Sequence, residues 1–200
     1  MKWRWWITWK LTYPLVKYFL HLKTEGVENV PERGAVVIAP NHLANLDPPI
    51  IGYAVKREVF YLAKEELFIV SKPFAWLIKT FNAIPIKRKG FDIKVFREVD
   101  RLVKKGQALV IFPEGTRSKT GKLLPFKSGV GMVAARYGIP VIPCYIENTN
   151  KPILNILKGK NPIKVKFGKP ILCEKKKDRF YYEEITRVIE REVKKLKERR

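Results

Sequence analysis

Cysteine and histidine are scarce in this sequence, which has two of each among its 200 residues. Cys144 and Cys173 lie far apart, with no C-x-x-C spacing and no nearby histidine. The sequence therefore predicts neither a zinc site nor a disulfide framework, and a reducing cytoplasm is the expected compartment. Both thiols are expected to pack in the protein interior rather than to act as nucleophiles.

The sequence also lacks a long uninterrupted apolar run. The first 22 residues are rich in aromatic and aliphatic side chains, but Arg4, Lys10 and Lys17 interrupt them. A spanning helix needs roughly 20 consecutive apolar residues. No A-x-A cleavage site of a signal peptide follows. Pro14 is expected to divide the segment into two short helices. We expect these N-terminal aromatic and basic helices to form an interfacial membrane anchor, because Trp favours the headgroup level and Lys meets lipid phosphates. Four tryptophans would carry this anchor: Trp3, Trp5, Trp6 and Trp9. The alternative is a terminal helix that packs on the domain core.

Acidic residues are few relative to basic ones. The chain has 41 Lys and Arg against 19 Asp and Glu, which gives a formal net charge of +22. An excess of this size attracts polyanions: nucleic acid, anionic lipid or an acidic carrier protein. Residues 151–200 hold 17 of the basic and 7 of the acidic residues, so one strongly basic face is expected.

Residues 23–200 alternate between strand and helix patterns, which predicts a single α/β domain with a mixed, largely parallel sheet flanked by helices. Apolar runs predict strands at 35–40, 59–63, 83–87, 108–113, 140–146 and 163–168. Helices are expected at about 48–56, 72–81, 91–105, 127–138 and 179–197. Residues 149–162, rich in Lys, Asn and Pro, are expected to form a surface excursion.

One of the two histidines lies in the stretch APNHLANLDPP, where His42 precedes Asp47 by five residues. Asp47 before two prolines predicts a helix N-cap, and His42 would follow a strand end. A turn between them would let the carboxylate accept a hydrogen bond from one imidazole nitrogen and leave the other free as a base. The alternative is that Asp47 only caps the helix and His42 is an incidental loop residue.

A second polar stretch, FPEGTRS at 112–118, also follows an apolar strand. Gly115 lets backbone amides approach a ligand, Thr116 and Ser118 add hydroxyl donors, and Arg117 has a planar fork that matches phosphate oxygens. Ligands of open α/β sheets bind beyond the carboxyl ends of the strands. If the two preceding strands are parallel, both loops lie at one site. The alternative is a strand-ending loop with a solvated Arg117.

The pairing of NHLANLD with FPEGTRS about 70 residues later resembles the glycerolipid acyltransferase family, and the resemblance covers about 24–167. AIPIKR, ending in Arg88, and IPVIPCYI, centred on Pro143, resemble two weaker blocks of that family. The chain departs from the family pattern at Ala44, where serine is usual, and at Asn82 and Ala83, where glycine precedes the Arg-ending strand.

The resemblance implies an enzyme of phospholipid biosynthesis that acylates the sn-2 hydroxyl of 1-acylglycerol-3-phosphate (lysophosphatidic acid) to give phosphatidic acid. His42, oriented by Asp47, would be the general base, and the hydroxyl would attack an acyl thioester without an acyl-enzyme or a metal. Arg88 and Arg117 would bind the substrate phosphate, with Glu114, Gly115 and Thr116 around its glycerol. Alternatively, Glu114 could have a structural role and accept hydrogen bonds from backbone amides at the strand end.

The resemblance implies an acyl carrier protein or acyl-coenzyme A as donor and no other cofactor, and the basic excursion and C-terminal helix would attract either. Residues 67–81 are a second candidate membrane-facing surface, although Trp76 and Phe81 could equally fill the core. The protein is expected to be monotopic on the cytoplasmic face of the inner membrane. The competing hypotheses are an acyltransferase for another lysophospholipid or glycerol 3-phosphate, a noncatalytic membrane adaptor, and a nucleic-acid-binding module, for which no recognised motif is present.

Overall fold

The computed structural model describes the backbone of residues 3–86 and 93–199, and the side chains of residues 3–9 and of Leu77 lie outside this description. Within it, seven strands form one sheet in the order β1-β7-β6-β2-β5-β3-β4. They are β1 (Lys23–Glu25), β2 (Val36–Pro40), β3 (Val59–Lys64), β4 (Ala83–Ile86), β5 (Ala108–Val110), β6 (Val141–Glu147) and β7 (Lys164–Phe167). Five neighbouring strands from β6 to β4 are parallel, whereas β7 is antiparallel to β6 and β1 is parallel to β7. The prediction of a mixed, largely parallel sheet is confirmed.

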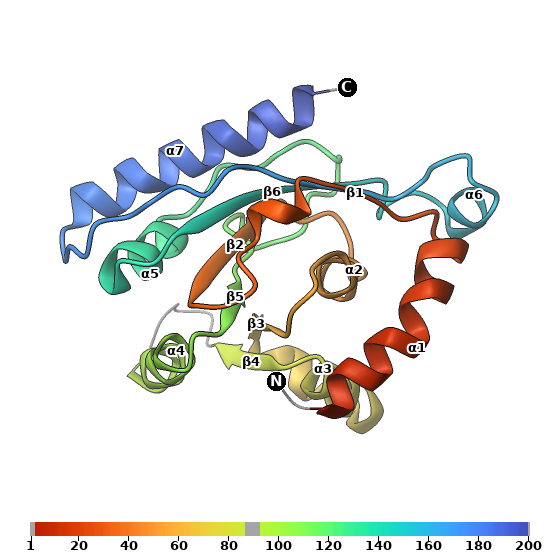
Figure 1. Cartoon of the computed structure of the whole chain (residues 1–200), viewed down its shortest axis with the longest axis horizontal. Coiled ribbons are helices and arrows are strands. Elements are labelled where there is room, and N and C mark those ends of the chain that lie inside the picture. The colour runs from red at the N-terminus through yellow and green to blue at the C-terminus, as the bar shows by residue number, and fades with distance from the viewer. Residues whose placement is uncertain (1–2, 87–92, 200) are drawn as a thin grey trace.

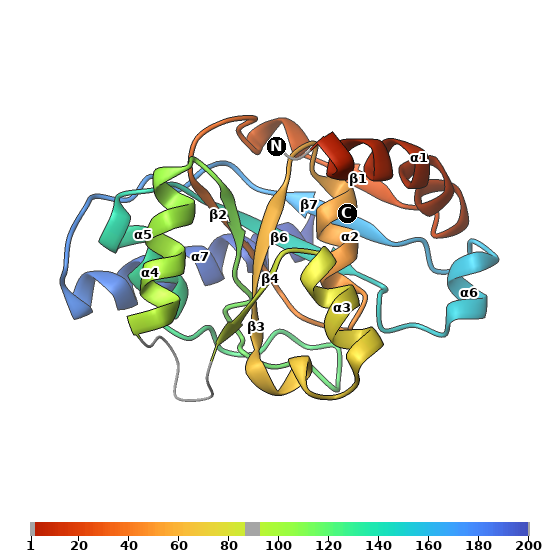
Figure 2. The same cartoon turned by 90° about the horizontal axis from the view of Figure 1, so that it is seen from below.

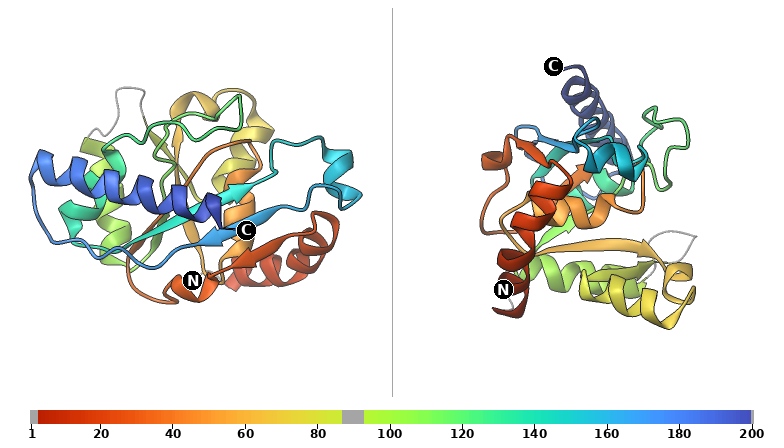
Figure 3. Two further views of the ribbon diagram at one scale, coloured as in Figure 1. Left: turned by 90° about the horizontal axis from the view of Figure 1, so that it is seen from above. Right: turned by 90° about the vertical axis from the view of Figure 1, so that its right-hand side faces the viewer.

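Helices cover both faces of the sheet (Figures 1 and 3). They are α1 (Trp3–Phe19), α2 (Asp47–Ala54), α3 (Lys72–Thr80), α4 (Ile93–Lys104), α5 (Gly129–Tyr137), α6 (Ile153–Leu157) and α7 (Arg179–Glu198), with short 3-10 turns η1 (Val27–Asn29) and η2 (Glu65–Phe68). Helices α1 and α2 pack on one face, and α4, α5 and α7 pack on the other. Gly131 permits close packing of α5 and α7, because a Cβ there would lie 2.2 Å from the Tyr182 carbonyl oxygen.

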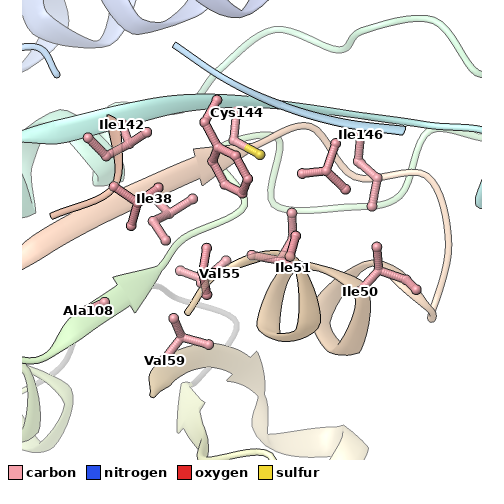
Figure 4. Packing of buried hydrophobic residues seen from close by; sticks show 14 of the residues in the cluster. Ile38, Ile50, Ile51, Val55, Val59, Ala108, Ile142, Cys144 and Ile146 are labelled. Carbon is pink, nitrogen blue, oxygen red and sulfur yellow. The ribbon is translucent and has the colours of Figure 1, made fainter. Parts of the chain in front are cut away.

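The central strand β2 is buried on both faces because every side chain in it is apolar. Val36 and Ile38 point to the core shared with α2, whereas Val37 and Ala39 point to the core shared with α4, α5 and α7. Figure 4 shows Ile38 in the first core, opposite the side chains of α2. A near-continuous apolar run is typical of a parallel strand covered by helices on both sides.

The parallel strands bring their carboxyl ends to one edge of the sheet. Ile38 of β2 and Tyr61 of β3 both pair with Val110 of β5, so the segments that follow these three strands leave the sheet at the same level. In Figure 2, η2 and the green segment after β5 lie along the lower edge of the molecule. Ligands of open α/β sheets bind at this edge.

The N-terminal segment forms a single helix, so the prediction of two short helices divided at Pro14 is wrong. Contacts on both sides of Pro14 explain why α1 continues: Thr12 Oγ1 is hydrogen-bonded to Tyr53 Oη of α2 at 2.9 Å, and Val16 packs against the core. Pro14 therefore removes one backbone donor inside a helix that tertiary contacts hold. Within residues 3–86 and 93–199, each helix is too short or too polar to cross a bilayer.

Apart from the two short 3-10 turns, one strand and one α-helix were not predicted, β1 and α6. β1 is short and polar, and it pairs with β7 from Lys23 to Glu25. The surface excursion at 149–162 contains α6, whose end contacts the segment after α1: His21 Nε2 lies 3.2 Å from the Leu157 carbonyl oxygen. The excursion is thus partly helical and packs beside the N-terminal helix (Figure 2).

Candidate functional site

The loop after β2 is fixed to the sheet by a buried asparagine. Asn41 is 1% exposed; its Nδ2 donates to the Ile146 carbonyl oxygen at 3.1 Å, and its Oδ1 accepts from the Ile146 N–H at 2.7 Å. The Asn41 side chain thus continues the hydrogen bonding between β2 and β6 beyond the end of β2. The following residue, His42, therefore leaves the sheet in a defined direction.

Asp47 turns its carboxylate back onto this loop. Its Oδ2 accepts hydrogen bonds from His42 Nδ1 at 2.7 Å, from the Leu43 N–H at 2.5 Å and from the Ala44 N–H at 2.8 Å. The prediction that Asp47 is the helix N-cap is wrong by one residue, because the N-cap is Leu46 and Asp47 is the first residue of α2. The predicted hydrogen bond between His42 and Asp47 is present, and the carboxylate that makes it is fully buried.

The hydrogen bond to Asp47 determines the tautomer of His42. An ionised carboxylate only accepts hydrogen bonds, so Nδ1 carries the proton and Nε2 keeps its lone pair. The imidazole ring stacks on Phe112, with ring centroids 4.2 Å apart and an interplanar angle of 29°. The side chain is 18% exposed, so a ligand can reach it. This arrangement can accept a proton at Nε2.

Glu114 and Ser118 join the segment after β5 to the His42 loop. Glu114 Oε1 accepts from the His42 N–H at 3.1 Å, and the Ser118 N–H donates to the His42 carbonyl oxygen at 2.8 Å. Both residues are buried. His42 is therefore held through both of its backbone polar groups. Glu114 accepts a hydrogen bond from a backbone N–H, as expected for a structural role.

Burial raises the pKa of the Glu114 carboxyl to about 7, and the negative charge of Asp47 acts in the same direction. Hydrogen bonds from the backbone N–H groups of His42 and Leu124 act in the opposite direction. Glu114 Oε2 is buried without a hydrogen-bond partner among the described residues. Near neutral pH, this carboxyl changes between its neutral and charged forms.

Glu114→Gln is expected to flatten the pH dependence of stability. Because the folded pKa lies above the ordinary value of 4.5, the folded state keeps a proton that the unfolded state has lost between those two values. Wild-type stability should fall as pH rises through this window, by at most about 1.4 kcal/mol per pH unit. Gln keeps the carbonyl acceptor without titrating. The Tm of the variant relative to wild type should rise by a few degrees from pH 5 to pH 8, and parallel Tm profiles would contradict the assignment.

Arg117 links the two loops from the solvent side. Its Nη1 donates to Asn45 Oδ1 at 2.8 Å, across a sequence separation of 72 residues. Gly115 has a φ of 67°, which a glycine adopts without strain, and Gly115, Thr116 and Arg117 are all exposed. The predicted residues 114–117 thus lie beside His42, with one cation facing solvent.

Several predicted residues fall outside the described part of the chain. Arg88 lies within 87–92, and the side chains of Trp3, Trp5, Trp6 and Trp9 belong to the undescribed set at the start of α1. At 67–81, the alternatives were a membrane-facing surface and packing in the core. Trp76 is 69% exposed, whereas Phe81 packs against the core. Burial raises the pKa of the Cys144 thiol well above its ordinary value and that of Cys173 to about 11.

Three residues of this site were not predicted: Asn41, Asn45 and Phe112. NHLANLD contains an asparagine on each side of His42, but their partners lie about 70 to 105 residues away. Phe112 opens the FPEGTRS stretch and was read only as the end of a strand. Its position directly before a polar loop is the signal that could have identified it.

Known proteins are similar to the part of the chain that contains both loops of the site. A family model described as Acyltransferase matches residues 21–147. The chain is 32% identical over 136 residues to a chloroplastic 1-acyl-sn-glycerol-3-phosphate acyltransferase from Brassica napus, covering 66% of this chain and 39% of that protein. It is 28% identical over 151 residues to the 1-acyl-sn-glycerol-3-phosphate acyltransferase of Bacillus subtilis, covering 75% and 73%.

A solved structure shares the fold. The 1-acyl-sn-glycerophosphate (LPA) acyltransferase PlsC from Thermotoga maritima superimposes with a TM-score of 0.68 at 24% sequence identity, over 98% of this chain and 80% of that one. The chain spans 38% to 50% of the length of three curated relatives, from Brassica napus, Arabidopsis thaliana and Borreliella burgdorferi. The family model covers more than half of the chain, including both loops of the site, and the chain therefore belongs to the acyltransferase family.

Proposed function

We propose that this protein transfers a fatty acyl group from a thioester to the sn-2 hydroxyl of 1-acylglycerol-3-phosphate, giving phosphatidic acid. The observation that carries the proposal is the 2.7 Å hydrogen bond between His42 Nδ1 and Asp47 Oδ2, in a loop bonded to the FPEGTRS segment. That bond leaves one imidazole nitrogen free, in a loop that an exposed arginine contacts through Asn45. A base next to a cation suits an acceptor that carries both a hydroxyl and a phosphate. The names of the relatives give the same acceptor.

His42 would act as general base in a direct transfer. Nε2 takes the hydroxyl proton as the acceptor oxygen forms a bond to the thioester carbonyl carbon. The tetrahedral intermediate then collapses, the carbon–sulfur bond breaks, and the departing thiolate receives the proton from the imidazolium. Asp47 stabilises the charged ring while it carries that proton. The acyl group thus moves from sulfur to the acceptor oxygen, and the proton moves from that oxygen to the thiolate. No residue of the protein becomes acylated.

The acceptor would lie along residues 114–117. Arg117 is exposed and keeps donors beyond the one bonded to Asn45, so a phosphate can form a charge-assisted contact with it. Gly115 and Thr116 would border the glycerol. Glu114 would hold the His42 backbone in place, as its buried contact with the His42 N–H suggests. Arg88 remains a proposed second phosphate contact.

The donor would be acyl carrier protein or acyl-coenzyme A, both of which are anionic. Residues 151–200 provide an excess of ten positive charges, and six of the lysines and arginines there lie in α7. Most of these side chains are exposed. Such a surface favours encounter with an acidic carrier or a nucleotide phosphate.

The protein would work as a monotopic enzyme on the cytoplasmic face of the membrane. Exposed apolar side chains on α1 support an interfacial anchor: Leu11, Leu15, Tyr18 and Phe19. A second group extends from η2 through the following residues to α3: Leu67, Ile69, Val70 and Trp76. Apolar side chains of this size beside lysines are typical of helices that lie in the headgroup region. A lysolipid would then need to leave the bilayer only far enough to expose its hydroxyl.

An acyl-transfer assay tests this function. Wild-type protein with liposomes is supplied with acyl carrier protein or coenzyme A thioesters, and with 1-acylglycerol-3-phosphate, a different lysophospholipid or glycerol 3-phosphate. Phosphatidic acid should be the main product, formed with the highest kcat/KM. Faster acylation of another acceptor would support one of the alternative substrates. Binding to liposomes without transfer to any acceptor would support the noncatalytic adaptor.

A further inference from the structure

A lysine outside both sequence motifs reaches the candidate site. Lys127 directly precedes the N-cap of α5, and its N–H donates to the Pro113 carbonyl oxygen at 2.9 Å. This bond closes the loop that begins with FPEGTRS. Lys127 is therefore held at the base of the Glu114–Gly115 turn although it lies 12 residues away in sequence.

The side chain of Lys127 lies over Gly115. A Cβ placed on Gly115 would be 3.0 Å from Lys127 Nζ and 3.3 Å from its Cδ. The ammonium therefore lies within van der Waals range of this turn, and a larger residue at 115 would displace it. Two features favour glycine at this position: its positive φ of 67°, and the lysine side chain that lies where a Cβ would be.

Lys127 has no acidic partner in the described parts of the chain. The residue is exposed, and within the described parts of the chain no carboxylate accepts a hydrogen bond from its ammonium. The neighbouring Glu114 is buried and accepts from the His42 N–H. Arg117, on the same turn, is also exposed. The segment at 114–117, which is hydrogen-bonded to the His42 loop, thus has two exposed cations on or over it.

We propose that Lys127 is a phosphate-binding residue of this site, which together with Arg117 selects the dianionic phosphomonoester of the acceptor. Phosphomonoesters carry about −1.5 to −2 charges at pH 7, with a second ionisation near pH 6. One lysine and one arginine match that charge, the arginine through its planar fork and the lysine as a point charge. The inference rests on the proposed function and deepens it.

The test compares Lys127→Gln with wild type and with Lys122→Gln, which removes an exposed lysine from the same loop. Lys127→Gln should raise the KM for 1-acylglycerol-3-phosphate roughly 10- to 100-fold, the range expected for a lost charge-assisted hydrogen bond. The KM for the thioester should stay unchanged. Lys127→Arg should restore most of the loss, and Lys122→Gln should resemble wild type. The KM ratio of variant to wild type should grow between pH 5.5 and pH 7.5, as the phosphate gains its second charge.

A binding measurement separates this inference from the proposed function. Glycerol 3-phosphate, with glycerol as the neutral control, should raise the Tm of wild type and of Lys122→Gln but not that of Lys127→Gln. This pattern would support the phosphate site even if the wild type acylates no lysophosphatidic acid. An equal Tm rise in Lys127→Gln, no rise in wild type, or an unchanged acceptor KM in an active Lys127→Gln enzyme would overturn it.

Discussion

Asp47→Asn should reduce kcat by on the order of 10²- to 10⁴-fold while the protein stays folded. Asn can place its side-chain oxygen where Asp47 Oδ2 now accepts from His42 Nδ1 and from the Leu43 and Ala44 N–H groups. The ring would then keep its position and its tautomer. The side chain would lack the negative charge that stabilises the imidazolium after His42 has taken the substrate proton.

Steady-state kinetics and the Tm decide this prediction together. Asp100→Asn, which breaks an ion pair with Lys104 on the surface of α4, is the matched control and should change neither measurement by much. A small Tm change with a large loss of kcat is the expected result for Asp47→Asn. If kcat remains close to wild type, the charge of Asp47 does not assist the reaction, and its role is to hold the loop backbone.

His42→Ala should lose at least about 10²-fold in kcat, the lower end of the contribution of a general base. The substitution removes the nitrogen that accepts the proton and leaves the two backbone bonds of residue 42, from Ser118 and to Glu114, in place. It also leaves the buried Asp47 carboxylate without its side-chain partner, so some loss of stability is expected. The KM values should change far less than kcat, because the proton is transferred in the reaction step.

The only other histidine of the chain provides the control for this experiment. His21 lies beside α6, where its Nε2 is 3.2 Å from the Leu157 carbonyl oxygen, away from both loops of the site. His21→Ala should therefore keep wild-type kcat. Equal loss of activity in the two variants would point to unfolding or membrane detachment instead of missing base catalysis, and a fully active His42→Ala would refute the proposed mechanism.

Much of the sheet was predictable because its strands are short apolar runs between polar breaks. The six predicted strands are all present, with ends that differ by a few residues. The meeting of the two motif loops also follows from the sequence, since parallel strands bring their carboxyl ends to one edge. β1 was missed because Lys23–Glu25 is polar and depends on β7, which lies about 140 residues later in the chain, for its pairing.

The details of the site depend on tertiary contacts that the sequence does not encode locally. Asp47 before two prolines fits an N-cap, but its carboxylate binds the preceding loop, where His42 and two N–H groups compete for it. The stacking of His42 on Phe112 joins segments about 70 residues apart. Similarly, Pro14 was expected to end a helix, but contacts with α2 and the core hold α1 together on both sides of it.

The strand order of the sheet has a consequence for folding during synthesis. β2 leads into the His42 loop, but its neighbours in the sheet, β5 and β6, are translated much later. Until Val141–Glu147 has emerged from the ribosome, β2 has an unpaired edge, and its apolar side chains lack part of their cover. Such non-local pairs form slowly and leave exposed strand edges that favour aggregation. The segment with the proposed base is thus made well before both strands that flank β2, and it reaches its final structure only after β6 has been made.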